Sequence, residues 1–489
     1  MKKYSKGFWI TFVAVALLFL SGWFVFWEIR THGLESLKRL LGILPVTQET
    51  RTDLDTVISL AGSLLDTDGQ EKVFLLLFQN NLELRPGGGF IGSFGILKVR
   101  DGQITHFLVH DTGNFDGRIP DTVAPPYPMK ETLKIPSWKF RDSNYSPDFA
   151  ENAKWAETFY QMGQGGEKFD GIIGVTTNVL TSFLRVTGPV ELEGYPGTYG
   201  ADNAILDLEY QVEQGYLKQN IDFGERKSVM GILGLEILER VKALPLNKKY
   251  ELFQVMLDDL NRKDVQLLFR DENLQADVVA AGWDGRLDAD WQNDYLLLVD
   301  ANLNSWKSDY FVKRSYDYTV DLGKDIPEVT LAVTYRHTAK EKSWFTKDYQ
   351  TFLRVYVPKG SFLTSATNTA TEPVFGEFMN KKYFGTLIHV PLGTEKTVTF
   401  RYTLPKEMER TWYDLKVEKQ PGLNDVPVTV TVLKADGEKE TKSFILNSNT
   451  IYSEVKCRHF ASSRTRCGIQ LFRNLRFRGS SQGVSCMCS

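Results

Sequence analysis

The sequence predicts an α/β part, with a layered mixed sheet and flanking helices, that follows one transmembrane helix and precedes a β-sandwich. Three observations predict this order. Residues 8–27 are an uncharged apolar run, residues 72–300 alternate strand and helix patterns, and residues 308–452 alternate apolar and polar positions. A chain of 489 residues has room for roughly three such units, and its 42% apolar content is ample for buried cores.

The amino terminus predicts a membrane anchor. Residues 8–27 carry no charge over about the length that a helix needs to cross a bilayer, and Trp9, Trp23 and Trp27 lie near the ends. Large aromatic residues continue where a cleaved signal peptide would have small ones. We expect residues 1–7 to be a cytoplasmic tail, residues 8–27 a single-pass signal anchor in the cell membrane, and the bulk of the chain to be extracytoplasmic.

Residues 28–71 have two amphipathic helical stretches broken near Pro45. Their apolar positions recur at helical spacing, which predicts either a membrane-proximal helical stalk or a helix that packs on the next part of the chain.

The α/β part should span residues 72–300, because strand and helix signals alternate along it. Residues 72–78 are a short apolar run, typical of a strand buried on both faces, and Asp101-Gly102 predicts a hairpin. A helix should begin with Ser146 as its cap and end at Gly163. The further predictions are a strand at 169–176, helices at 177–187, 223–243 and 247–262, and strands at 265–270 and 294–301.

The pattern changes after residue 308. Alternating apolar residues predict strands that are buried on one face, and Asp436-Gly437 predicts another hairpin. Regular strands of this kind without helices predict a β-sandwich-like domain over residues 308–452.

The balance of basic and acidic side chains argues against a nucleic-acid-binding protein. The chain has 58 basic and 61 acidic side chains, so no domain-wide excess of lysine and arginine points to a nucleic-acid partner. Residues 453–489 are anomalous, because this end carries seven basic residues, one acidic residue and all four cysteines of the chain. We expect a disordered tail or a misassembled end of the coding sequence, with a basic nucleic-acid-binding tail as the alternative.

The run ELRPGGGFIGSFG is a candidate substrate-binding loop. The amides of Gly87, Gly88 and Gly89 could surround an anion, and Arg85 could bind a phosphate with two hydrogen bonds. The alternative is a tight turn between buried strands, with Arg85 paired to Glu83 or another acid. A P-loop is excluded because Ser93 stands where the lysine is required.

Oxygen-rich loops supply candidate metal ligands and catalytic groups. Asp111 and Asp116 follow a predicted strand, and Asp142 precedes a predicted helix. Carboxylates of this kind suit Mg²⁺, and Asp111 or Asp116 could also serve as a catalytic base; turns and helix caps are the alternative. Arg226 and Lys227 open a helix, where a positive charge gains little from the helix dipole, so they are further candidate anion ligands.

Four runs carry a family resemblance: ELRPGGGFIGSFG, RDSNYSPDFAENA, FDGIIGVTTNVL and TGPVELEG. They resemble the bacterial domain-of-unknown-function family 4012, over about residues 72–320. The order of elements is also similar to the LytR-CpsA-Psr family, which transfers glycopolymers from polyprenyl-pyrophosphate carriers to the cell wall. That resemblance implies Arg85 and Arg226 as pyrophosphate ligands and Asp111, Asp116 or Asp142 as Mg²⁺ ligands.

Two functions follow as expectations. The first is a cell-envelope phosphotransferase that binds a polyprenyl-pyrophosphate-linked glycan and transfers it to a cell-wall sugar hydroxyl. The second is a non-catalytic surface protein that binds polysaccharide or a protein partner, with Trp344, Phe345 and Tyr349 as candidate stacking residues. Convergence of Arg85, Arg226 and carboxylates on one cleft favours the first function, and mutual pairing of these groups favours the second.

Overall fold

The structure is a computed structural model that describes residues 47–65, 69–408 and 413–453. The predicted cytoplasmic tail, the predicted anchor at 8–27 and residues 454–489 lie outside the described residues. Within the described ranges, no helix is both long and apolar enough to cross a membrane.

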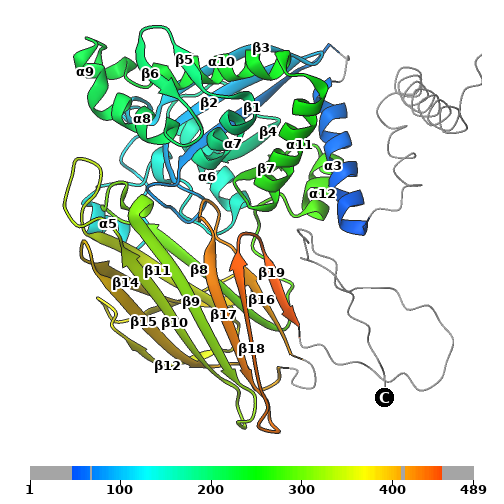
Figure 1. Ribbon diagram of the computed structural model, residues 1–489, viewed down its shortest axis with the longest axis vertical. Helices are drawn as coiled ribbons and strands as arrows, with labels where there is room; N and C mark the ends of the chain where they lie inside the picture. Colours follow the sequence, from blue (N-terminus) through cyan, green and yellow to red (C-terminus); the bar gives the residue numbers. More distant parts are fainter. Residues whose placement is uncertain (1–46, 66–68, 409–412, 454–489) are drawn as a thin grey trace, which may run out of the picture.

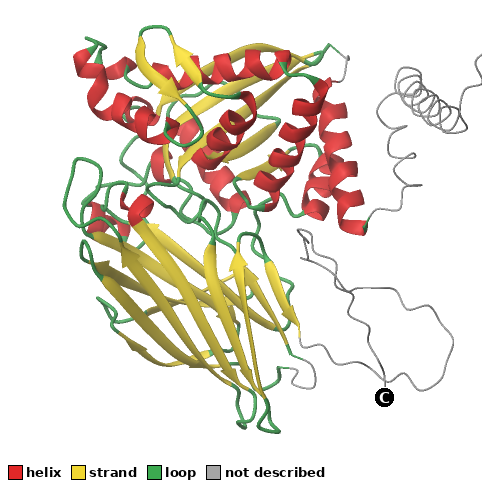
Figure 2. Ribbon diagram, viewed as in Figure 1, coloured by secondary structure: helices red, strands yellow, loops and turns green. Residues whose placement is uncertain are grey.

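The first part of the chain is built on a five-stranded mixed sheet with the order β3-β2-β1-β4-β7 (Figures 1 and 2). β1 and β4 are parallel, and the other neighbours are antiparallel. The hairpin at Asp101-Gly102 is confirmed, and both residues have the positive φ of a tight hairpin turn. The strands are β1 (Glu71–Asn80), β2 (Phe90–Arg100), β3 (Gln103–Asp111), β4 (Gly171–Thr176) and β7 (Val265–Phe269).

Helices cover both faces of this sheet. One face is covered by α3 (Gln48–Leu65), α11 (Leu246–Asn261) and α12 (Glu272–Ala281), which bury Phe74 and Val99 beneath them. Of the two expectations for this segment, the structure shows the packing helix for residues 48–65. This helix packs on α12, and the Thr56 hydroxyl donates to the Asp277 carbonyl at 3.0 Å.

The opposite face is covered by α6 (Phe149–Met162) and an aromatic segment that precedes it. Phe94 of β2 is the centre of this layer, with its ring 5.0 Å from that of Phe115 and 4.7 Å from that of Phe140. The segment includes the short elements α4 (Thr112–Asp116), α5 (Met129–Leu133) and η1 (Phe140–Asp142). α6 ends at Gly163 as expected, but its cap is Asp148 rather than Ser146.

A smaller helical unit follows β4 and has its own core, which includes Leu184, Val190 and Leu233. The helix from Thr177 ends before Gly188, as the sequence predicts. The elements are α7 (Thr177–Thr187), β5 (Val190–Leu192), β6 (Tyr195–Tyr199), α8 (Ala204–Tyr210), η2 (Gln211–Gly215), α9 (Tyr216–Lys218), η3 (Phe223–Glu225) and α10 (Ser228–Ala243).

The second part of the chain consists of two six-stranded sheets that share one core (Figure 2). The alternating residues Val329, Leu331, Val333 and Tyr335 are all buried, as their pattern predicts. The first sheet contains β12 (Phe362–Thr367), β15 (Glu395–Thr403), β10 (Glu328–His337), β9 (Val312–Asp321), β17 (Val426–Leu433) and β18 (Lys439–Leu446). The second contains β13 (Val374–Phe378), β14 (Lys381–Val390), β11 (Tyr349–Pro358), β8 (Asp294–Asn302), β16 (Asp414–Glu418) and β19 (Thr450–Ser453).

The position of β8 corrects the predicted organisation. The sequence assigns residues 294–301 to the α/β part, yet β8 pairs antiparallel with β11 and parallel with β16 in the second sheet. All nine of its residues are buried, so its apolar run is compatible with a central strand of the α/β sheet or of the β-sandwich. Periodicity alone cannot distinguish a central strand of a sandwich from one of an α/β sheet.

Hydrogen bonds to backbone carbonyl groups join the loop after β1 to the second part of the chain. The Asn302 amide donates to the Leu84 carbonyl at 2.8 Å, and the Asn81 side chain donates to the Gly422 carbonyl at 2.9 Å. The Gln420 side chain donates to the Arg85 carbonyl at 3.1 Å. The candidate loop is therefore part of the junction between the two parts.

Candidate functional site

The glycine loop is a packing element rather than an open anion nest. Gly87, Gly88 and Gly89 are buried, the Gly87 amide donates to the Asn144 carbonyl, and the Gly88 amide donates to the Arg85 carbonyl. A Cβ on Gly89 would lie 2.3 Å from the backbone of Asn80. These glycines let two chain segments approach closely, and the predicted role of all three in substrate binding is not supported.

Arg85 is buried between two carboxylates, with 2% of the residue exposed. Its guanidinium lies 3.0 Å from Glu83 and 3.1 Å from Asp142, and it also donates to the Asn302 carbonyl. The turn with Arg85 paired to Glu83, which the sequence left open, is therefore present. Because its hydrogen bonds go to the protein, Arg85 is not a free pyrophosphate ligand, and the expectation that it binds substrate needs correction.

The predicted catalytic and metal-binding carboxylates are also paired. Asp116 is buried against Arg141, and burial raises its pKa although Arg141 opposes this shift. Asp142 holds Arg85. Asp111 lies 2.9 Å from Lys227 and accepts a hydrogen bond from the Asn114 amide, so it caps α4 as the turn-and-cap alternative proposes.

The pKa values of Asp111 and Lys227 are both lowered, for different reasons. Burial opposes ionisation of Asp111, but the adjacent Lys227 together with the backbone amides of Asn114 and Gly113 outweighs it, so the pKa of Asp111 is lowered. Burial lowers the pKa of Lys227, and Asp111 opposes that change. Lys227 also donates to the Gly92 carbonyl, so its ammonium has two partners within the protein.

Asp111, Asp116 and Asp142 do not form a Mg²⁺ site. Each is committed to a different cation of the chain, namely Lys227, Arg141 or Arg85. Across residues 47–65, 69–408 and 413–453, no three His, Cys, Asp or Glu side chains are grouped so as to hold a metal ion. The donor set that Mg²⁺ requires is not assembled from the predicted carboxylates.

The structure nevertheless links the two predicted arginines through one charge network. Arg226 lies 3.6 Å from Glu213 and stacks over the Phe223 ring at 4.0 Å. Lys307 lies 3.5 Å from Glu213, and together with Arg85 it offsets the rise in pKa that burial imposes on Glu83. Arg85 and Arg226 thus lie at opposite ends of a row of alternating positive and negative side chains. They are not two ligands that face one open cleft.

Lys307 and its second partner, Glu209 at 3.3 Å, were not predicted as members of this network. Lys307 lies in the run NSWKSDY, where a single lysine has no spacing signal. Glu209 belongs to α8, where an exposed helical face is the default expectation for a charged residue. Only the tertiary contact identifies them.

An exposed aromatic cluster lies beside this network and draws on both parts of the chain. Tyr210 of α8 and Trp344 of the β10–β11 loop have ring centroids 6.0 Å apart, and Phe345 packs against Trp344 at 5.2 Å. Tyr310 contacts the other side of Phe345 at 6.0 Å. Tyr210, Trp344 and Tyr310 are 39%, 45% and 43% exposed. We call these four residues the aromatic cluster.

Of the three stacking residues that the sequence predicts, only Trp344 is available to a ligand. Phe345 is buried as the centre of the aromatic cluster. Tyr349 is fully buried and donates to Asp309 within the core of the second part. Tyr210 and Tyr310 were missed, because neither has a neighbouring aromatic pattern that distinguishes it from a packing residue.

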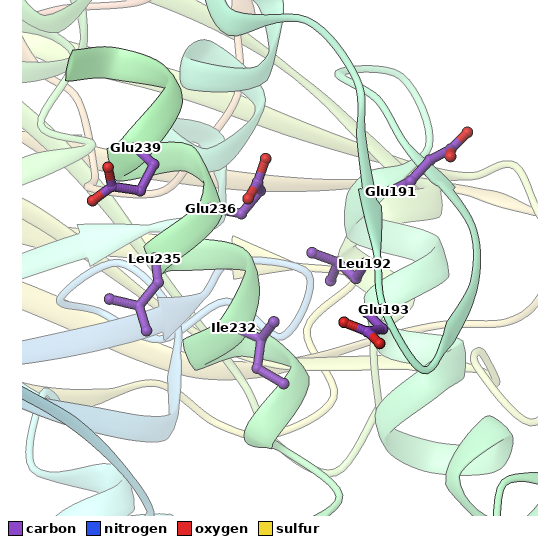
Figure 3. A pocket seen from close by; sticks show the side chains of 7 residues that line it. All are labelled: Glu191, Leu192, Glu193, Ile232, Leu235, Glu236 and Glu239. Carbon is purple, nitrogen blue, oxygen red and sulfur yellow. The ribbon is translucent and has the colours of Figure 1, made fainter. Parts of the chain in front are cut away.

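A pocket of about 310 Å³ lies elsewhere, between α10 and the turn after β5 (Figure 3). None of the predicted site residues lines it. Glu236 and Glu239 accept hydrogen bonds from Arg240 and Lys242, so part of its acidic rim is already neutralised. The lining residues are Glu191, Leu192, Glu193, Ile232, Leu235, Glu236 and Glu239.

Comparison with known families finds one match. Residues 69–212 match the model of a family described as a protein of unknown function (DUF4012). This segment contains the glycine loop, the three candidate aspartates and α8. No curated protein matches the chain.

Solved structures with partial similarity come from several bacteria. Lin1025 from Listeria innocua is 12% identical with a TM-score of 0.26, over 45% of this chain and 80% of its own. The protein gbs0355 from Streptococcus agalactiae is 10% identical with a TM-score of 0.28, over 45% and 75%. A putative nutrient binding protein from Legionella pneumophila is 8% identical with a TM-score of 0.20, over 28% and 54%. At these scores, the similarities carry no argument about function.

Proposed function

We propose that this protein is a non-catalytic cell-envelope protein that binds polysaccharide. The observation that carries the proposal is the aromatic cluster, in which Tyr210, Tyr310 and Trp344 expose their rings to solvent at the junction of the two parts. Aromatic rings present flat apolar faces with polar edges, which suit the apolar faces and hydroxyl rims of sugar rings. Exposed aromatic groups gathered in one place mark an interaction surface.

The pairing of the candidate catalytic groups supports the same proposal. Asp111 is paired with Lys227, and Asp116 is paired with Arg141. A general base must reach the proton that it abstracts, and a carboxylate in a buried ion pair is held away from a substrate hydroxyl. Membrane anchorage through residues 8–27 and an extracytoplasmic location are part of the proposal, because they would place the aromatic cluster among envelope polysaccharides.

The test is binding of the full chain to a panel of purified polysaccharides, measured by affinity electrophoresis. Trp344→Ala should weaken binding about tenfold, on the scale that one lost aromatic stacking contact costs. The matched control is Phe362→Ala, because Phe362 is 65% exposed. It pairs with Thr403 of β15, at the opposite end of the first sheet from His337, where β10 ends and the loop with Trp344 begins. Equal loss in both variants, or no binding by the wild type, would refute the proposal.

Glycan transfer from a polyprenyl-pyrophosphate carrier is the second candidate, and one observation favours it. Arg226 and Lys227 are adjacent in the chain; Arg226 pairs with Glu213 of the network that ends at Arg85, and Lys227 is close enough to Glu213 to interact with it electrostatically. Lys227 would have to leave Asp111 to bind a diphosphate. Wild-type protein that transfers the sugar phosphate of a glycolipid analogue to an acceptor hydroxyl and releases polyprenyl monophosphate, in contrast to Lys227→Met, would support transfer.

A further inference from the structure

The ring of Trp306 makes cation–π contacts with two lysine side chains. The ammonium of Lys347 is 4.7 Å from the centre of its ring, and the ammonium of Lys342 is 5.2 Å from the same point. A ring face attracts one cation readily, but two cations on one ring also repel each other. Both ammonium groups therefore lie near one ring, and each is within the electrostatic influence of the other.

Neither ammonium is neutralised by an acid. No described carboxylate lies within the 4.0 Å of an ion pair from Lys342 or Lys347, and Lys347 has only the Asn304 side chain at 3.2 Å. Burial lowers the pKa of Lys347, and Lys342 lowers it further, while the more distant Asp348 and Glu83 oppose the shift. Residues 1–455 carry ten more acidic than basic side chains, so this local excess of positive charge opposes the general balance.

The backbone fixes the position of Trp306. Its φ is +53° and that of Asn304 is +69°, a conformation that costs a side-chain-bearing residue about 1–2 kcal/mol. The Asn302 side chain donates to the Trp306 carbonyl at 3.0 Å, and Trp306 forms a β-bridge with Thr346. Such a strained conformation persists only where surrounding contacts hold it in place, and it is often retained at binding sites.

The two lysines and the aromatic cluster share one loop, residues 342–347, which a backbone bridge and a hydrogen bond join to residues 306 and 307. Thr346, the bridge partner of Trp306, directly follows Trp344 and Phe345 in the chain, and the Lys307 amide donates to the Phe345 carbonyl at 3.1 Å. Trp344, whose ring is 45% exposed, is thus within three residues of both lysines along the chain, a spacing that a polymeric ligand can bridge.

We propose that Lys342 and Lys347 bind the acidic groups of a polysaccharide that lies on the aromatic cluster, so that the ligand is an acidic rather than a neutral glycan. An anion bound beside these ammonium groups would offset their mutual repulsion, and Trp306 is the positioning residue that both of them contact. This inference rests on the proposed function and names its ligand class.

The experiment uses the full chain and four polymers: polygalacturonate, its fully methyl-esterified form, dextran and poly-L-glutamate. The first two share a sugar backbone and differ in charge, whereas poly-L-glutamate has the charge without the sugar rings. We expect polygalacturonate to bind at least tenfold more tightly than each of the others, with an affinity that falls as salt rises.

The double variant Lys342→Gln/Lys347→Gln should lose this preference and bind polygalacturonate no better than the methyl ester. Both lysines are solvent-accessible, so the thermal midpoint should not change. The matched control is Lys382→Gln, whose ammonium lies over Phe362 at 6.0 Å and should not affect binding. A Trp306→Leu variant should reduce the preference for the acidic polymer in the same way.

The outcomes separate this inference from the proposed function. Equal binding of polygalacturonate and its methyl ester overturns the acidic ligand but leaves polysaccharide binding intact. Equal binding of poly-L-glutamate overturns recognition of a sugar. A double variant that binds like the wild type overturns the site, and a wild type that binds no polysaccharide overturns both proposals.

Discussion

Gly88 and Gly422 pack backbone against backbone at the junction of the two parts of the chain. A Cβ added to Gly422 would lie 1.8 Å from the carbonyl oxygen of Gly88, and Gly422 has a φ of +72°. Both facts require glycine at position 422, the second because a side chain strains this conformation. The contact places the glycine loop, which the sequence predicts to bind an anion, against the second part of the chain.

Gly422→Ala should destabilise the protein by about 3 kcal/mol or more, because a clash with rigid backbone adds to the cost of the positive φ. Gly437→Ala is the control, since Gly437 has a φ of +86° but no atom within 4 Å of its added Cβ. It should cost only about 1–2 kcal/mol, the conformational part alone. Chemical denaturation of both variants gives the comparison, and equal losses would contradict the packing argument.

Gly89→Ala should destabilise the fold by about 2–3 kcal/mol or more, because the new Cβ meets the Asn80 backbone at 2.3 Å. Gly92→Ala should change stability by about 1 kcal/mol or less, because its nearest neighbour is the end of the Lys227 side chain at 3.6 Å. Urea unfolding curves measure both. If Gly89→Ala folds normally and only loses anion binding, the loop is a ligand site after all.

Arg85→Met should cost about 3–5 kcal/mol, because it leaves Glu83 and Asp142 without their cation in a buried setting. Arg100→Met removes a pair of similar length, 3.1 Å to Glu71, but Arg100 is half exposed. Its loss should cost about 0–1 kcal/mol. The measurement is the unfolding midpoint in denaturant, and a mild effect of Arg85→Met would restore Arg85 as a candidate ligand.

Asp259→Asn should change how stability depends on pH. Burial raises the pKa of Asp259 to about 7, against the hydrogen bond from Ser182 that lowers it, and the nearby Asp264 raises it further. Between pH 4 and 7 the folded state thus holds a proton that the unfolded state has released. The contribution of Asp259 to stability is therefore present at low pH and declines as pH rises through this window.

The wild type should lose up to about 1.4 kcal/mol per pH unit relative to Asp259→Asn over that range. Asparagine keeps an oxygen for the Ser182 hydroxyl and does not titrate. Thermal or denaturant unfolding at several pH values provides the measurement. Parallel curves for the two proteins would show that Asp259 is ionised in the folded state.

Local patterns in the sequence predicted much of the fold. The Asp101-Gly102 hairpin, the helix ends at Gly163 and Gly188 and the alternating strand of Val329 all depend on neighbours a few residues away. The assignment of β8 failed because a continuous apolar run is compatible with the centre of any sheet. Its partners in β11 and β16 come much later in the chain.

The site was predicted less well, for a related reason. The sequence singled out Arg85, Asp111, Arg226 and Lys227 as candidate site residues, and the structure joins Arg85 and Arg226 in one network and pairs Asp111 with Lys227. It could not show that these charges neutralise one another. That outcome depends on distances between residues far apart along the chain.

The sequence by itself determined where strands, turns and helix ends lie, because backbone conformation and burial pattern are set by residues within a few positions. Tertiary structure decided which charges are paired and which remain open to a ligand. Arg85 is not open to a ligand, because Asp142 and the carbonyl of Asn302 accept its hydrogen bonds. Lys342 and Lys347 both lie at the Trp306 ring, and no carboxylate in the described part of the chain is within ion-pair distance of either. Electrostatic energy depends on separation in space and not on separation in sequence.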